Sequence, residues 1–190
     1  KAEKGQYEAA TAIGGQLELT DNVEASIAIS KGVTDLDAAF AVLDEIGFAP
    51  AQVSALRAIA ETRSEVGDTA DAVRCLESAL AYAGTIEHDE ERIRYFCDIG
   101  NSFVVAKRND LAIKAFDLAF QQTKELDNIH RDFFFSNCAL GFLHSNSQDL
   151  AEKALDEIRD KTQMASSLVG FAREAWKKDD KEAALEDLDE

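Results

Sequence analysis

Apolar residues recur along most of this chain at the spacing of one helix face. In the segment TADAVRCLESALAYA, residues 69–83, small and large apolar side chains such as Ala72 and Leu76 fall on one side, and Glu77 falls on the other. This pattern predicts an amphipathic helix. Asp68 precedes it and is a candidate N-cap, because a short acceptor side chain can bond the free N–H groups of the first helical turn.

The same periodicity continues on both sides of this segment. No run of about four to eight residues alternates apolar and polar side chains with Val, Ile and Thr enrichment, so we expect no strand and an all-α fold. The pattern predicts helices over residues 5–18, 22–31, 36–46, 50–65, 69–84, 88–106, 110–126, 129–144, 149–160, 162–177 and 181–189.

A set of small and large apolar residues repeats at fixed offsets. A small residue is followed by a second one twelve positions later, then by a large apolar residue after four positions and by an apolar or small residue after three more. The four segments with this spacing are Ala60, Ala72, Leu76 and Ala79; Gly100, Ala112, Phe116 and Ala119; Ala139, Ala151, Leu155 and Ile158; and Ala172, Ala184 and Leu188. An earlier, weaker copy is Ile27, Ala39, Leu43 and Ile46.

The repeated spacing has a physical explanation. Two antiparallel helices joined by a short turn approach closely only where neither carries a large side chain, so the two small residues mark a helix crossing. The large residue that follows can then pack into the neighbouring repeat, and each helical hairpin needs a copy beside it to bury that face. In the earlier copy Ile27 stands at the first small position, and we therefore expect its two helices to lie farther apart.

These residues resemble the tetratricopeptide repeat (TPR), which has small and large apolar residues at the same offsets and a further apolar residue four positions before the first small one. That further residue is Leu56, Phe96, Phe135 or Leu168 in the four segments. The resemblance implies a right-handed α-solenoid of about five stacked antiparallel helix hairpins, forming a single TPR-like domain over residues 1–190. The expected repeats are 20–52, 53–90, 93–130, 132–163 and 165–190, after an N-terminal helix at 1–19.

The sequence departs from the family pattern in two respects. The Pro that ends the second helix in the family is missing, and the spacing between equivalent Ala residues is 33, 40, 39 and 33. The extra residues fall around TIEHDEE and KELDNIH, where we expect longer helices or a longer connection rather than a new site. Another class of α-solenoid remains open as an alternative.

In proteins that this chain resembles, the first helix of each hairpin lines a concave groove. Carried over by position, the candidate peptide-binding residues are Arg94, Asn101, Val104, Phe133, Leu140, Leu143, His144, Val169, Arg173, Trp176 and Lys177. A family subclass binds C-terminal carboxylates through a Lys and an Asn four residues apart. Here the equivalent positions hold Arg57 and Glu61 in one repeat and Cys97 and Asn101 in the next, which disfavours that function.

Three consecutive phenylalanines fall in the third clear repeat. Phe133, Phe134 and Phe135 together sweep about 200° of a helix, so they cannot all face one core. The first helix of a solenoid repeat packs against neighbours on two sides, and burial of all three is the favoured interpretation. The alternative is that one of them faces outward.

Composition and charge narrow the possible partners. The chain of 190 residues carries 37 acidic and 20 basic side chains and a formal charge of −17, which disfavours nucleic acid and anionic lipid as ligands. No apolar run approaches the roughly 20 residues of a membrane span, and we expect a cytoplasmic protein. The sequence begins at Lys1 rather than Met, which leaves open a targeting segment or domain before it.

The sequence contains no pattern typical of catalysis or metal binding. Cys75, Cys97 and Cys138 are widely spaced within apolar helical patterns, which indicates reduced, packed thiols. A Gly-rich phosphate loop, a nucleophile motif and paired His ligands are all missing, so we expect no catalytic residues, cofactor or metal. The favoured function is a non-enzymatic module that binds a protein or peptide. The alternative is a structural spacer in a larger multidomain protein, with self-association open.

Overall fold

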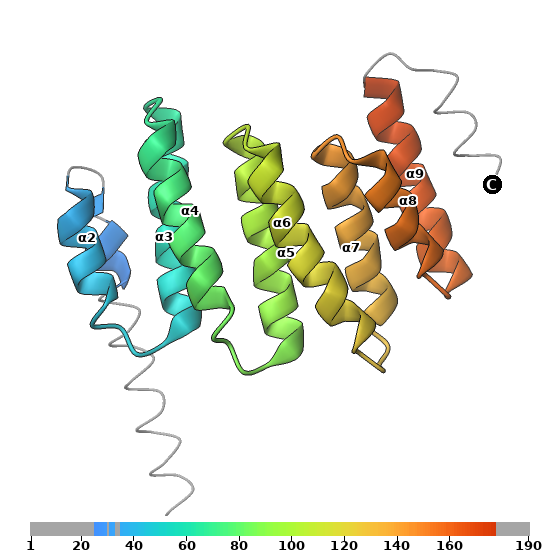
Figure 1. Ribbon diagram of the computed structural model, residues 1–190, viewed down its shortest axis with the longest axis horizontal. Coiled ribbons are helices and arrows are strands. Elements are labelled where there is room, and N and C mark those ends of the chain that lie inside the picture. The colour runs from blue at the N-terminus through green and yellow to red at the C-terminus, as the bar shows by residue number, and fades with distance from the viewer. Residues whose placement is uncertain (1–24, 30, 33–34, 178–190) are drawn as a thin grey trace, which may run out of the picture. The chain divides into compact units, whose positions relative to one another are not determined.

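The computed structural model describes residues 25–29, 31–32 and 35–177 (Figure 1). These residues form helices and no strand, which confirms the all-α prediction. The chain divides into two compact units, residues 1–86 and 87–190, and each is described by itself. The helices predicted at 5–18 and 181–189, and with them Ala184 and Leu188, lie outside the described residues.

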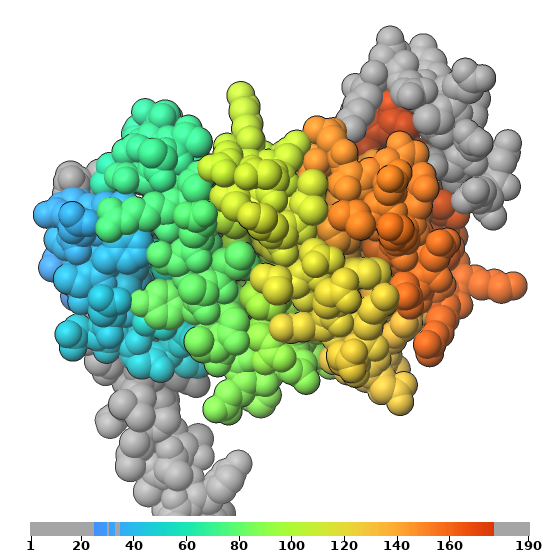
Figure 2. All heavy atoms as spheres, in the orientation of Figure 1, coloured from blue at the N-terminus to red at the C-terminus, as the bar shows by residue number. Residues whose placement is uncertain are grey.

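The helices coincide with the predicted segments to within a few residues. In the first unit, residues 25–29 and 31–32 are helical and are followed by α2 (Leu36–Leu43), α3 (Ala49–Glu65) and α4 (Thr69–Ala83). The second unit contains α5 (Asp89–Val105), α6 (Asn109–Lys124), α7 (Arg131–His144), α8 (Gln148–Asp156) and α9 (Lys161–Lys177). In the second unit, α6 and α8 cover much of the surface that faces the viewer in Figure 2.

The extra residues of the two longer repeats lengthen their second helices. Helices α4 and α6 contain 15 and 16 residues, whereas α2 and α8 contain 8 and 9. The turn inside each described hairpin stays short, at residues 66–68, 106–108 and 145–147. Of the two alternatives from the sequence, longer helices therefore account for most of the added length.

The three hairpin turns share one backbone geometry. Gly67, Lys107 and Asn146 occupy the middle of these turns with φ of 83°, 58° and 60°. In each turn the next residue donates its N–H to a carbonyl five residues back, as Arg108 does to Phe103 at 2.9 Å. In this arrangement, which commonly ends a helix, a residue in the left-handed conformation allows the last carbonyl groups of the helix to accept hydrogen bonds. At the start of α4, Asp68 accepts from the Asp71 N–H at 3.3 Å, which confirms the predicted N-cap.

Phe116 of α6 fills the space left by two glycines in the second unit. A Cβ atom added at Gly100 of α5 would lie 2.7 Å from the Phe116 ring, and one at Gly141 of α7 would overlap the same ring. The ring is fully buried and meets Phe142 edge-on, with centroids 6.0 Å apart. The large residue of one repeat thus packs against both its own hairpin and the next, as the spacing predicted.

The expectation for the earliest copy of the repeat is wrong by one position. Ile27, expected at the helix crossing, is 44% exposed, whereas Ala28 beside it is fully buried. The small residue that a crossing requires is therefore present in this copy too. A Cβ atom added at Gly32 would overlap the Ile59 side chain, so the first helix also lies close to α3 of the next repeat.

Substitution of Gly100 by Leu tests the glycine–phenylalanine packing. Gly100→Leu should lower the free energy of unfolding by about 1–3 kcal/mol, because the new side chain must displace the Phe116 ring. Denaturant unfolding measures this loss. Gly47→Leu is the control, since Gly47 is exposed and a Cβ atom there meets nothing within 4 Å. Equal stability of the two variants would show that the assigned register is wrong.

Substitution of Lys107 by Gly tests the turn geometry. Lys107 has a φ of 58°, a region that costs a residue with a Cβ atom about 1–2 kcal/mol. Removal of this strain, partly offset by the greater freedom of glycine in the unfolded chain, should raise the free energy of unfolding by up to about 1 kcal/mol. Lys114→Gly, in the interior of α6, should instead lower it by about 1 kcal/mol in the same denaturation experiment.

Candidate functional site

The first helices of successive hairpins contact one another in the second unit. Helix α7 packs against both α5 and α9, while α6 packs against α5 and α7 and α8 packs against α7. The resemblance to TPR proteins implied this order, and it makes α5, α7 and α9 a shared surface.

A pocket of about 230 Å³ lies between α5 and α7. Its lining residues are Arg94, Cys97, Asp98 and Asn101 from α5 and Asn137, Leu140, Gly141 and His144 from α7. The structure thus brings together four of the predicted groove residues, Arg94, Asn101, Leu140 and His144. The pairing also follows the repeat register, because Asn101 and Leu140 are each one residue beyond the small residue of their repeat.

Two amide side chains face this pocket with their hydrogen-bonding groups uncommitted. Asn101 is exposed and Asn137 is half-buried, and within the described part of the chain neither side chain has a hydrogen-bond partner. An amide offers both donors and an acceptor, the set that a peptide backbone requires. Asn137 was not among the groove residues carried over from the family by position. The structure buries Ser136, whose hydroxyl lies 2.7 Å from that of Ser167 on α9.

Two ionisable residues that line the pocket, Arg94 and His144, lie close to carboxylates. The Arg94 guanidinium lies 3.5 Å from the Glu91 carboxylate and stacks over the Tyr95 ring, 4.5 Å from its centroid. His144 Nε2 lies 3.6 Å from Glu174 Oε2, which connects α7 to α9. The pocket therefore combines amide and apolar groups with an arginine that is already paired.

The other predicted groove residues do not line this pocket. Phe133 is 51% exposed, while Phe134 and Phe135 are buried, so the favoured interpretation that all three are core is wrong. Phe133 instead lines a second hollow of about 410 Å³ with residues that include Arg159 and Gln163. Of the remaining predicted residues, Val104 and Leu143 are half-buried and Val169, Arg173 and Trp176 are exposed on α9. Lys177 ends α9, and its side chain is outside the described part.

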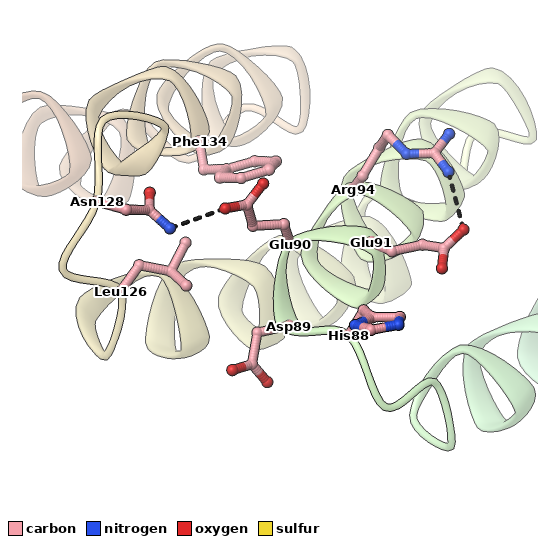
Figure 3. A pocket seen from close by; sticks show the side chains of 8 residues that line it. All are labelled: His88, Asp89, Glu90, Glu91, Arg94, Leu126, Asn128 and Phe134. Carbon is pink, nitrogen blue, oxygen red and sulfur yellow. Dashed lines mark hydrogen bonds and ion pairs between the residues drawn. The ribbon is translucent and has the colours of Figure 1, made fainter. Parts of the chain in front are cut away.

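A third and larger hollow, of about 640 Å³, lies at the start of α5 (Figure 3). Glu90 accepts a hydrogen bond from Asn128 at 2.8 Å on one side, and Glu91 pairs with Arg94 on the other. Asp89 pairs with Arg92. These carboxylates therefore already have local partners, and their negative charge interacts favourably with the positive end of the α5 helix dipole. Among the described residues no group of three or more His, Cys, Asp or Glu side chains is placed to hold a metal ion.

Two charged residues next to Phe133, Arg131 and Asp132, hold the start of α7 in place. The buried Arg131 guanidinium donates to the Glu157 carbonyl oxygen at 2.9 Å and to its carboxylate at 3.0 Å. Asp132 Oδ2 accepts from the backbone N–H groups of Arg159 and Asp160 at 2.9 and 2.7 Å. These bonds connect α7 to the α8–α9 loop, and no repeat pattern in the sequence pointed to them.

Comparison with known proteins places the fold. No known family profile matches the chain, and no curated protein matches it in sequence. Among solved structures, it is similar to the nearly identical TPR-like repeats of a protein from Podospora anserina described as a kinesin light chain. The TM-score is 0.50 and the identity is 15%, over 88% of this chain and 90% of the other. This likeness shows that the chain has a TPR-like helical-repeat fold.

None of the described helices combines the length and the apolar character that crossing a bilayer demands.

Substitution of Arg131 by Met tests the anchor of α7. Arg131→Met keeps the apolar stem but removes the two hydrogen bonds to Glu157, so the free energy of unfolding should fall by about 1–3 kcal/mol. Arg159→Met is the control, because Arg159 is exposed, and it should change stability by no more than about 0.5 kcal/mol. Denaturant unfolding of both variants gives the comparison, and a neutral Arg131 variant would contradict the assigned role.

Proposed function

We propose that this chain is a non-enzymatic interaction module that binds a peptide segment or a helix on the surface shared by α5, α7 and α9. The observation that supports this most is the α5–α7 pocket, where the uncommitted amides of Asn101 and Asn137 face the same space as Leu140. A ligand backbone can exchange hydrogen bonds with the amides while one of its apolar side chains covers Leu140.

The charge of this surface favours a particular class of peptide. The chain as a whole carries a formal charge of −17, yet Arg173 is exposed on α9 at the repeat position that Leu140 occupies on α7. An acidic ligand side chain would be attracted to Arg173 and repelled by most of the remaining surface, which restricts where it can bind. The expected ligand therefore has an apolar anchor residue and an acidic residue close to it.

Exposed aromatic and apolar side chains could supply the anchoring contacts. Phe133 is 51% exposed at the start of α7, and Val169 is 46% exposed on α9. Large side chains in the centre of an interface commonly carry most of its binding energy. Trp176, 59% exposed, supports the second candidate equally well, because in a structural spacer this end of α9 would pack against a further domain.

Selection from a peptide library distinguishes a peptide-binding surface on α5, α7 and α9 from a structural spacer. Random-sequence peptides selected on the immobilised chain would be measured by fluorescence anisotropy with the chain and with Phe133→Ala/Arg173→Glu. The double variant should weaken binding by about 2 kcal/mol or more, which is roughly 30-fold in Kd, because it removes an anchor and reverses a charge.

The matched control makes the same chemical changes on α6. Lys114 and Leu118 are both exposed there, so Leu118→Ala/Lys114→Glu removes a similar apolar area and reverses a similar charge. This variant should bind the selected peptides as the unmodified chain does. Loss of binding in the α6 variant alone would assign the partner to the other face. Failure to select any peptide that depends on Phe133 or Arg173 would favour the spacer.

A further inference from the structure

The loop between α6 and α7 presents an isoleucine to solvent. Ile129 is 90% exposed, although the loop around it is bonded to the rest of the second unit. The Asn128 side chain donates to Glu90 of α5 at 2.8 Å and accepts from the His130 N–H at 2.9 Å. Ile129 lies between these two bonded residues, so the loop holds its side chain outward as an apolar projection.

The hollow of about 410 Å³ adjoins this projection. Ile129 and Phe133 line it from the α6–α7 loop and α7, while Arg159 and Gln163 line it from the α8–α9 loop and α9. Both loops lie at the lower end of the helices of the second unit in Figure 1. The hydrogen bonds that Asp132 accepts from the α8–α9 loop hold the second wall in place. The projection and the hollow are therefore both preformed and lie side by side.

Two charged side chains that line the hollow are uncommitted. Within the described part of the chain, neither the Asp127 carboxylate of the α6–α7 loop nor the Arg159 guanidinium of the α8–α9 loop forms an ion pair or a hydrogen bond. Arg131, Asp132 and Asp160 line the same hollow but already have partners. Each of the two loops thus presents one exposed charge, and the two charges have opposite signs.

The two opposite charges restrict what can fill the hollow. A ligand that carries charges of only one sign would be attracted by one of these side chains and repelled by the other. A fitting partner needs an apolar projection with a charge of each sign beside it. Ile129, Asp127 and Arg159 supply this set themselves. The surface is therefore self-complementary, which is the property of an interface with two-fold symmetry.

We propose that two copies of this chain associate through this surface about a two-fold axis. Ile129 of each copy enters the hollow of the other, and Asp127 of each copy pairs with Arg159 of the other. The pairing follows from the order of residues in the loop. Asp127 lies two residues before Ile129, so an Ile129 side chain that enters a second copy carries Asp127 toward the wall that holds Arg159.

The association should be weak. One apolar side chain in each hollow and two ion pairs make a small interface, and each copy carries a formal charge of −17 that opposes association. At an ionic strength of about 0.15 M, charges more than about 8 Å apart are largely screened, whereas pairs in contact are screened less. The proposal is independent of the peptide-binding proposal, because Asp127, Ile129 and Arg159 are unchanged in the variants that test peptide binding.

Sedimentation equilibrium of the whole chain between about 10 μM and 1 mM at this ionic strength measures the association. We expect a dimer whose proportion rises with concentration. Ile129→Ala should raise the dimer Kd by about tenfold or more, because it removes both apolar projections. Asp127→Arg and Arg159→Asp should each raise it by about tenfold or more, because each places like charges together at both contacts.

A mixture of the two charge variants distinguishes a pair between copies from any effect within one copy. In a mixed dimer of Asp127→Arg with Arg159→Asp, both contacts again join opposite charges, and the summed charge equals that of the unmodified dimer. The mixture should therefore dimerise with a Kd close to that of the unmodified chain, although each variant alone does not. A fluorescent label on one variant identifies the mixed dimer in the same experiment.

The matched controls are Glu152→Arg and Lys153→Asp, which change the net charge by the same amounts at exposed positions of α8. Each should alter the dimer Kd by no more than about twofold. A chain that stays monomeric up to about 1 mM would overturn the proposal, as would a dimer that the three substitutions leave unchanged or that the mixture fails to restore. A monomeric chain whose selected peptides lose affinity in Ile129→Ala would also overturn it, and would assign the hollow to another protein.

Discussion

The second unit depends on one aromatic ring seated between two glycines. Phe116 projects from α6 into the space where Gly100 of α5 and Gly141 of α7 have no side chains. The ring thereby brings α5 and α7 together, and only because these helices are close do their outer side chains share a pocket. Packing in the interior is dense enough that a single added methyl group at either glycine would have to be accommodated by movement of a helix or of the ring.

Much of the fold could be predicted from the sequence because the residues that pack hairpins together repeat at fixed offsets. Gly100 and Phe116 were assigned correctly since their spacing recurs in several segments, and the helix spans follow from the same periodicity. The register failed at Ile27, where a small residue stands directly beside the assigned position. Periodicity predicts which face of a helix a residue lies on. It does not decide between two adjacent residues, such as Ile27 and Ala28, when either could lie on that face.

The candidate site could be predicted only in part. Arg94, Asn101, Leu140 and His144 line one pocket because they follow the register of the repeat. Arg131 was missed since its partner Glu157 lies far away in sequence. Contacts of this kind depend on how individual side chains turn across a helix interface, and no repeated pattern encodes them. The exposed position of Phe133 likewise follows from the rotation of α7 about its axis.

The carboxylate of Asp132 sets the rotational phase of α9. It accepts hydrogen bonds from the backbone of Arg159 and Asp160, and Asp160 in turn accepts from the Gln163 N–H at 2.8 Å in the first turn of α9. Because these bonds hold Arg159, Asp160 and Gln163, the number of residues in the short α8–α9 loop affects the rotation of α9 about its axis. One residue more would turn α9 by about 100° about its axis and carry Glu174 away from His144 of α7. The bonds of Asp132 and the length of this loop therefore act together on which α9 side chains lie beside α7.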